Sequence, residues 1–327
     1  MTRTGILAPD PRSSYGTENR QLRRTARLPK RVDIVEVSPR DGLQNEARLL
    51  TVEQKLHMIE QLSSAGVRDI EAGSFVNPRQ VPQMADSDLL FRQLTHSKGQ
   101  RYSALVPNLQ GFHRAADSGA KRVALFTAAS ETFCRKNTHC SIEESLQRFN
   151  PVLVQAKERA ISVRGYISCV AGCPYEGEVP LQRVTELTQR LLAAGCDEVC
   201  LADTTGVGTP EQFSAMIAAV SRHSPVARLA VHCHDTFGRA LDNIHAALSA
   251  GISVVDSSVA GLGGCPYAHG AKGNVASEDL VHMLHGCGVE TGIDLQHLIS
   301  CGNHISALLG RNNQSRVANA IGGSPVT

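Results

Sequence analysis

The chain contains no tryptophan, and aromatic residues make up only 4% of its 327 residues. Such a small number of rings disfavours a surface on which nucleic-acid bases stack. The formal net charge is only +2 at pH 7, so the chain has no general electrostatic attraction to nucleic acid or to an anionic membrane. No apolar run approaches the roughly 20 residues that a bilayer-spanning helix needs. We therefore expect no nucleic acid and no membrane among the partners of this protein.

Cysteine pairs typical of structural zinc are also missing, although the chain has ten cysteines. Cys169 and Cys173 form one Cys-x-x-x-Cys pair and Cys196 and Cys200 another, but no matching second pair follows either at ribbon or finger spacing. The sequence also shows no signal peptide that would direct it to an oxidising compartment. We expect mostly free thiols and a cytoplasmic location.

Residues 1–30 differ from the rest of the chain because they are rich in arginine and poor in apolar residues. The pattern predicts a basic, flexible N-terminal extension. A transit peptide, which would place the protein in the mitochondrial matrix, is the alternative, although Asp10 and Glu18 count against it.

After residue 31, short β-rich runs alternate with segments of helical periodicity. Thr51, Ser141 and Thr209 are good helix N-caps, and several helices are expected to end at glycine. Eight strands alternating with helices over about 250 residues is typical of a (β/α)8 TIM barrel, a fold of the α/β class. A doubly wound sheet is the alternative, but no glycine-rich turn follows the first strand. The expected strands are Val32–Val37, Arg68–Ala72, Tyr102–Val106, Arg122–Thr127, Val163–Cys169, Glu198–Ala202, Leu229–His234 and Ser253–Val259.

The pattern assigns residues 31–290 to the catalytic barrel. Residues 291–327 are expected to form a C-terminal helical extension that packs on the barrel. Chemistry in such barrels takes place at the carboxyl ends of the strands. The polar residues that fall at those ends are Arg40, Asp41, Glu71, Asp203, His232, His234 and Asn274.

His232 and His234 are two residues apart on one strand, so their side chains share a face and Cys233 points the other way. Two imidazoles on one face can hold a divalent cation. Together with Asp41 and Asn274 they make a mixed nitrogen and oxygen set that suits Mg²⁺, Mn²⁺ or Co²⁺. Taken singly, Asp41 could instead cap a loop and Asn274 could close a turn.

Cys265 lies in a glycine-rich segment, Gly261–Tyr267, that follows the last expected strand. Because glycines permit unusual backbone conformations, this loop could close over the site and bring the thiol into it. The alternative is a phosphate-binding loop in which the cysteine has no role.

Five segments together resemble 3-hydroxy-3-methylglutaryl-CoA (HMG-CoA) lyases, which belong to the metal-dependent DRE-TIM metallolyase superfamily. They are Ser38–Glu46, Ser74–Val76 with the nearby Val81–Met84, Ser168–Gly177, His232–Gly238 and Val255–Tyr267. The resemblance extends from about residue 30 to about residue 310. It implies metal-assisted retro-Claisen cleavage of HMG-CoA to acetyl-CoA and acetoacetate, as in leucine degradation and ketogenesis.

The resemblance also implies roles for single residues. Asp41, His232, His234 and Asn274 would hold Mg²⁺ or Mn²⁺. Arg40 would neutralise the enolate oxygen of acetyl-CoA, and Cys265 would act as acid or base. Glu71 and Asp203 would give polar support, and His232 could also relay a proton. The partner is an acyl-CoA thioester, for which Arg311 and Arg316 are candidate contacts, and the assembly is expected to be a homodimer.

Three alternatives remain open from the sequence. Glu71–Ser74 and Leu201–Thr205 differ slightly from the wording usual in these lyases, which leaves room for a longer 3-hydroxy-3-alkylglutaryl-CoA such as the isohexenyl compound. A Claisen-condensing synthase of the same superfamily would share Arg40 and Asp41 but would lack the Cys265 loop. A non-catalytic ligand-binding barrel would have lost at least one of the essential groups, and none is missing.

Overall fold

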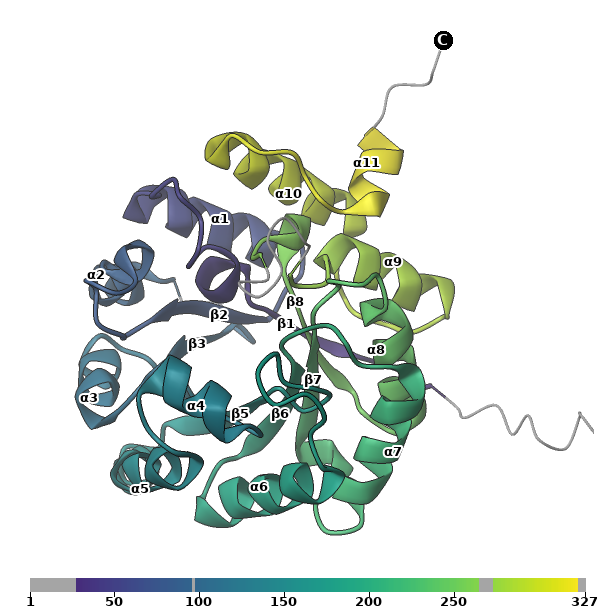
Figure 1. The fold of residues 1–327 in the computed structure, drawn as a ribbon. Helices are drawn as coiled ribbons and strands as arrows, with labels where there is room; N and C mark the ends of the chain where they lie inside the picture. Colours follow the sequence, from purple (N-terminus) through teal and green to yellow (C-terminus); the bar gives the residue numbers. More distant parts are fainter. Residues whose placement is uncertain (1–27, 96–97, 265–272, 323–327) are drawn as a thin grey trace, which may run out of the picture.

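The computed structural model describes residues 28–95, 98–264 and 273–322. Eight parallel strands close into one barrel in the order in which they occur in the chain, and β1 pairs with β8 to complete it (Figure 1). This confirms the predicted (β/α)8 TIM barrel. The strands are β1 Asp33–Glu36, β2 Asp69–Ser74, β3 Arg101–Leu105, β4 Arg122–Ala128, β5 Ser162–Ser168, β6 Glu198–Asp203, β7 Leu229–Cys233 and β8 Val254–Ser257.

Helices surround the barrel on the outside, as Figure 1 shows. Four short helical turns, labelled η, connect some of them. The helices and turns are η2 Ser38–Gly42, α1 Val52–Ser64, η3 Pro82–Met84, α2 Ser87–Gln93, α3 Leu109–Asp117, α4 Glu131–Thr138, α5 Ile142–Glu158, α6 Leu181–Ala194, α7 Pro210–Ser221, η4 Val226–Arg228, α8 Ala240–Ser249, η5 Val259–Gly261, α9 Ser277–Gly286, α10 Leu295–Leu309 and α11 Arg316–Gly322.

The helix boundaries follow from local chemistry. Thr51, Ser141 and Thr209 each accept a hydrogen bond from the backbone N–H three residues ahead and complete a capping box, as their positions predicted. Gly195 ends α6 with φ of 118°, a left-handed conformation in which a side chain would be strained. Local capping residues therefore define where these helices begin, and a glycine defines where α6 ends.

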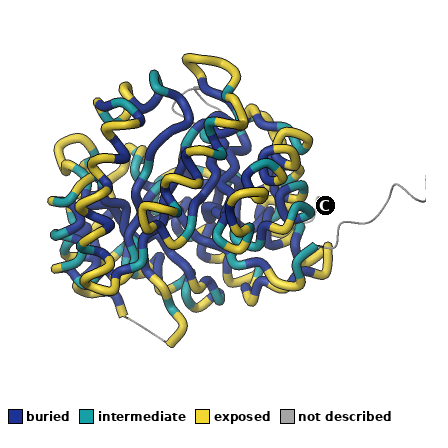
Figure 2. The backbone as a smooth tube through the Cα atoms, turned by 90° about the horizontal axis from the view of Figure 1, so that it is seen from below, coloured by how far each residue is buried: buried dark blue, intermediate teal, exposed yellow. Residues whose placement is uncertain are grey.

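The apolar core lies between the barrel and its helices. Figure 2 shows buried backbone through the centre of the molecule and exposed segments on the outside. A second, smaller apolar cluster takes one buried residue from each of the strands β3 to β7, including Leu105, Tyr166 and Ala230. The side chains of Glu36, Arg164 and Asp256 are also buried. Buried charges of this kind need partners, which they find near the candidate site.

The C-terminal helices pack on the first and last parts of the barrel. Helix α10 contacts α1 and η5, and α11 contacts α9 (Figure 1). None of the described helices has both the length and the apolar character that a membrane crossing requires. The predicted Cys265 lies outside the described residues.

Candidate active site

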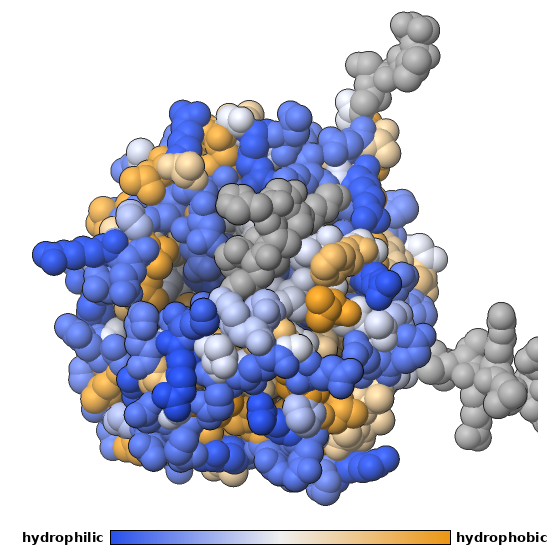
Figure 3. Space-filling view, in the orientation of Figure 1, coloured by the Kyte–Doolittle hydropathy of each residue, from blue (hydrophilic) through white to orange (hydrophobic). Residues whose placement is uncertain are grey.

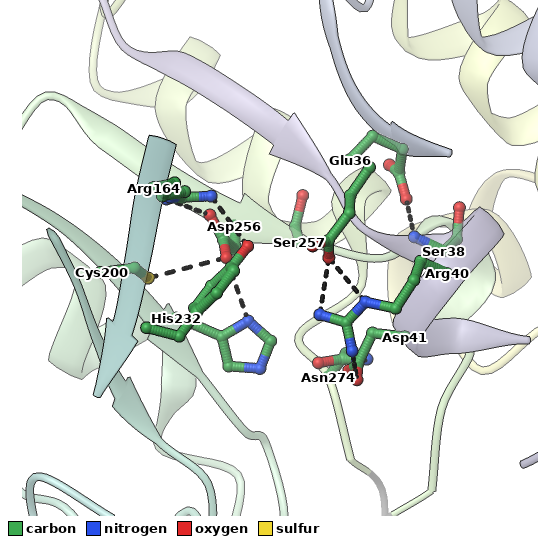
Figure 4. A network of polar contacts seen from close by, with 12 residues as sticks. Glu36, Ser38, Arg40, Asp41, Arg164, Cys200, His232, Asp256, Ser257 and Asn274 are labelled. Carbon is green, nitrogen blue, oxygen red and sulfur yellow. Dashed lines mark hydrogen bonds and ion pairs between the residues drawn. The ribbon is translucent and has the colours of Figure 1, made fainter. Parts of the chain in front are cut away.

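Arg40 and Asp41 are placed by η2, a turn of π-helix directly after β1. Gly42 is the last residue of this turn and packs closely against Leu262. A Cβ at position 42 would lie only 2.8 Å from the Leu262 Cβ. The Arg40 guanidinium joins two acidic residues. Its Nε donates to Glu71 Oε2 at 2.7 Å. One Nη donates to Asp41 Oδ1 at 2.7 Å (Figure 4). Glu71 extends from β2, so the pairing links the ends of two adjacent strands.

The predicted cation ligands come together at the ends of β1, β7 and β8. The rings of His232 and His234 have centroids 5.2 Å apart, and Cys233 between them packs into the apolar core. One donor atom from each of Asp41, His232 and His234 lies within 4.8 Å of the other two. Asn274 joins them because its Nδ2 donates to Asp41 Oδ2 at 2.8 Å.

Two buried polar atoms in this group have no hydrogen-bond partner among the described residues, namely His234 Nδ1 and Asn274 Oδ1. Such atoms are costly unless something satisfies them. A carboxylate, two imidazoles and an amide oxygen are donors that Mg²⁺ or Mn²⁺ accepts. The residues present therefore fit a divalent cation.

The charges of the group also suit a cation. Burial alone would raise the pKa of Asp41, but Arg40, His232 and His234 prevail and lower it to about 2. Burial, helped by the charge of His232, lowers the pKa of His234 to about 3. The carboxylate is thus an anion and His234 is neutral at pH 7, which are the forms that bind metal.

His232 differs from His234 because its Nδ1 lies 3.3 Å from Oδ2 of Asp256. Burial lowers the pKa of His232, but the hydrogen bond and the charge of Asp256 outweigh burial and raise it overall.

For Glu71, burial outweighs the effect of the neighbouring charge. Burial raises its pKa more than Arg40 lowers it. Its role in the structure is to hold Arg40.

Asp203 lies at the end of β6, and its carboxylate is hydrogen-bonded to the loop that follows this strand. Its carboxylate accepts hydrogen bonds from the backbone N–H of Gly206 at 3.0 Å and of Gly208 at 2.9 Å, and from the Thr205 hydroxyl at 3.3 Å. Burial raises its pKa, although these bonds lower it. Asp203 therefore shapes the loop after β6, next to the cation group.

The two arginines considered as CoA contacts are both paired within the chain. Arg311 forms an ion pair with Glu46, and Arg316 lies 3.2 Å from a carboxylate oxygen of Asp235. Sequence reasoning missed Asp256, which contacts His232, and Arg164, which pairs with Asp256. Their signal was a charged residue in the middle of a run expected to be a buried strand.

The fold is a (β/α)8 barrel, and a carboxylate, two histidines and an amide lie at the carboxyl ends of its strands. This combination is typical of barrel enzymes that use a divalent cation. The model of the HMGL-like family matches residues 31–305. The chain therefore belongs to the HMGL-like family.

Known relatives agree with this assignment. The chain is 54% identical over 293 residues to the human mitochondrial hydroxymethylglutaryl-CoA lyase, which covers 90% of each chain. It is 52% identical to a Pseudomonas aeruginosa protein named 3-hydroxy-3-isohexenylglutaryl-CoA/hydroxymethylglutaryl-CoA lyase, over 90% of this chain and 98% of that one. The predicted resemblance to HMG-CoA lyases is confirmed.

Solved structures show the same likeness. The crystal structure of hydroxymethylglutaryl-CoA lyase from Pseudomonas aeruginosa matches with a TM-score of 0.88 at 52% identity, over 90% of this chain and 98% of that one. An HMG-CoA lyase from Acinetobacter baumannii in complex with coenzyme A and 3-methylmalate matches with a TM-score of 0.85 at 36% identity, over 91% and 96% of the two chains.

Proposed function

We propose that this protein is a carbon–carbon lyase that cleaves HMG-CoA to acetyl-CoA and acetoacetate. One observation carries the proposal. Asp41, His232, His234 and Asn274 converge beside Arg40 at the catalytic end of the barrel, in a chain more than half identical to enzymes named HMG-CoA lyase.

Asp41, His232, His234 and the free Oδ1 of Asn274 would hold the cation. The Lewis acidity of Mg²⁺ or Mn²⁺ would lower the pKa of the tertiary hydroxyl of the substrate. Arg40 keeps the anionic form of Asp41 favoured by its direct contact. The Asp41 carboxylate is thus already ionised before a cation binds.

Arg40 acts on the other half of the reaction. When the carbon–carbon bond breaks, its electron pair moves onto the thioester, which becomes the enolate of acetyl-CoA. Arg40 stabilises the negative enolate oxygen, and Glu71 and Asp41 fix the guanidinium in place so that no reorganisation is needed.

Protons must balance on both sides of the cleavage. The substrate hydroxyl loses one proton as acetoacetate forms, and the enolate carbon gains one to give acetyl-CoA. We assign both transfers to Cys265, on the strength of its glycine-rich segment and of the resemblance. Its thiolate would take the hydroxyl proton, and the resulting thiol would donate that proton to the enolate carbon. Asp203 contributes by holding the loop after β6.

The test is release of acetyl-CoA from HMG-CoA by the purified protein, with and without Mg²⁺ or Mn²⁺. We expect cation-dependent release that falls by at least about 10²-fold in a Cys265→Ala variant. Cys287→Ala is the matched control, because Cys287 is an exposed thiol at the end of α9. No release by a folded, cation-loaded protein would reject the activity.

A second candidate substrate is a 3-hydroxyglutaryl-CoA with a longer apolar 3-substituent, such as the isohexenyl compound in the name of the Pseudomonas aeruginosa relative. A cavity of about 460 Å³ opens at the ends of β5, β6 and β7, and Ala171, Pro174, Val207 and Phe237 line it. Apolar side chains gather over the loops after β6 and β7 on the face seen in Figure 3. This cavity favours a long alkyl group.

The two substrates can be separated by comparing kcat/KM for HMG-CoA and 3-hydroxy-3-isohexenylglutaryl-CoA. Val207→Asp should lower the value for the longer substrate by at least about tenfold, because it places a charge where the alkyl chain would lie. HMG-CoA cleavage should stay within about threefold. Val154→Asp, at another exposed valine on α5, is the control. Equal losses for both substrates would reject this use of the cavity.

We also propose a homodimer in a reducing compartment, either the cytoplasm or the mitochondrial matrix. The nine cysteines in the described part of the chain are all free, which supports a reducing compartment. Light scattering on the purified protein would test the assembly.

A further inference from the structure

We infer that Asp256 is a positioning residue for the cation ligand His232. Its carboxylate holds the Nδ1–H of the imidazole, so that Nε2 keeps its lone pair and faces the cation group. The inference rests on the proposed cation site and deepens it, because it assigns a residue that selects the tautomer of one ligand.

The contact follows from the register of the barrel. His232 on β7 and Asp256 on β8 are direct partners between neighbouring parallel strands. Asp256 Oδ2 lies 3.3 Å from His232 Nδ1, and Asp256 is 1% exposed (Figure 4). An ionised carboxylate only accepts hydrogen bonds, so Nδ1 must be the protonated nitrogen. Metal-binding histidines are commonly oriented by a partner of this kind.

Asp256 is itself held in place from β5. Arg164 contacts Asp256 Oδ1 at 2.7 Å, and since β5 does not neighbour β8, this ion pair crosses the barrel interior. Arg164 also donates to the Tyr166 hydroxyl at 2.9 Å and lies 2.8 Å from Glu198. The Arg164 guanidinium pairs with this buried carboxylate and limits its rotation. The carboxylate therefore remains an anion in a fixed orientation.

The two histidines of the motif are not equivalent in this respect. His234 Nδ1 has no hydrogen-bond partner among the described residues, whereas His232 Nδ1 faces a charged acceptor. Only His232 is thus oriented from the barrel interior. A purely structural role for Asp256 would be to neutralise Arg164, and that role is shared with Glu198.

This shared role supplies a matched control. Asp256→Asn and Glu198→Gln each remove one negative charge from Arg164, but only the first alters the contact with His232. Both variants are expected to melt at a lower temperature than the wild type. Mn²⁺ titration followed by electron paramagnetic resonance should show affinity about 10 to 100 times weaker in Asp256→Asn and within about threefold of wild type in Glu198→Gln.

Unchanged Mn²⁺ affinity in Asp256→Asn, or an equal loss in both variants, would overturn the inference. If wild-type protein itself binds no Mn²⁺, the proposed cation site fails instead. A measurement without substitution covers the case in which Asp256→Asn does not fold. ¹⁵N spectra of histidine-labelled, Mg²⁺-loaded wild type should show the proton of His232 on Nδ1, and a proton on Nε2 would contradict our assignment.

Discussion

Arg40 makes contacts that a lysine could not reproduce. Its planar guanidinium binds Glu71 through Nε and one Nη and binds Asp41 through the other Nη. A lysine ammonium is a single point of charge and cannot span both carboxylates in this geometry. We therefore expect Arg40→Lys to lower kcat for HMG-CoA by about 10²- to 10³-fold.

The measurement is steady-state kinetics with HMG-CoA, together with Mn²⁺ affinity. Mn²⁺ affinity should fall much less than kcat, because Arg40 is not a cation ligand. Arg48→Lys, at an exposed arginine, is the matched control. A variant with unchanged kcat would show that Arg40 does not act on the enolate.

Single residues also show where sequence reasoning was sufficient. The shared face of His232 and His234 is a property of any strand, so spacing alone predicted it. The contact between Asp256 and Arg164 depends on the register and closure of eight strands. A charged residue within an expected buried strand marks Asp256 as unusual, but no local pattern shows which residue it contacts.

At the scale of elements, Glu278 of α9 connects three segments of the chain. Its carboxylate accepts from the backbone N–H of Ala260 in η5 and from Nδ2 of Asn313 before α11. Ala260 has a φ of 57°, which is uncommon for a residue with a side chain. Glu278 thus fixes the turn from which the glycine-rich segment begins.

Glu278 should also make stability depend on pH. Burial raises its pKa from 4.5 to about 8. Between these values the folded chain keeps the proton while the unfolded chain loses it, so stability falls as pH rises from about 4.5 to 8. Below this window the contribution is fully present. The contribution of Glu278 to this fall in the free energy of unfolding is at most about 1.4 kcal/mol per pH unit. We expect Glu278→Gln to remove that contribution.

Urea unfolding of both proteins at pH 5, 6.5 and 8 would measure this difference. The free energy of unfolding of Glu278→Gln should rise relative to that of the wild type as pH rises. Glu158→Gln changes an exposed glutamate on α5 and should give a constant gap. A constant gap for Glu278→Gln as well would show that Glu278 titrates normally.

Element boundaries were predicted to within one or two residues where capping chemistry is local, as at Thr51 and Thr209. The η2 turn was not predicted, because its π-helical form depends on the packing of Gly42 against Leu262, a residue more than 200 positions away. The division into residues 1–30, 31–290 and 291–327 stays a prediction.

For the whole molecule, the proposed cation site would join strands from opposite ends of the chain. Asp41 follows β1, whereas His234 and Asn274 follow β7 and β8. A cation that binds only the folded chain stabilises it by mass action, by about 2.7 kcal/mol at a concentration 100 times its Kd. We therefore expect Mg²⁺ or Mn²⁺ to raise the melting temperature by roughly 2 to 4 °C or more, and a chelator to reverse the rise. His234→Ala should abolish this shift because it removes a ligand, while His223→Ala, at an exposed histidine beyond α7, should keep it. If His234→Ala keeps the full shift, the stabilising cation binds elsewhere and the strand ends do not form its site.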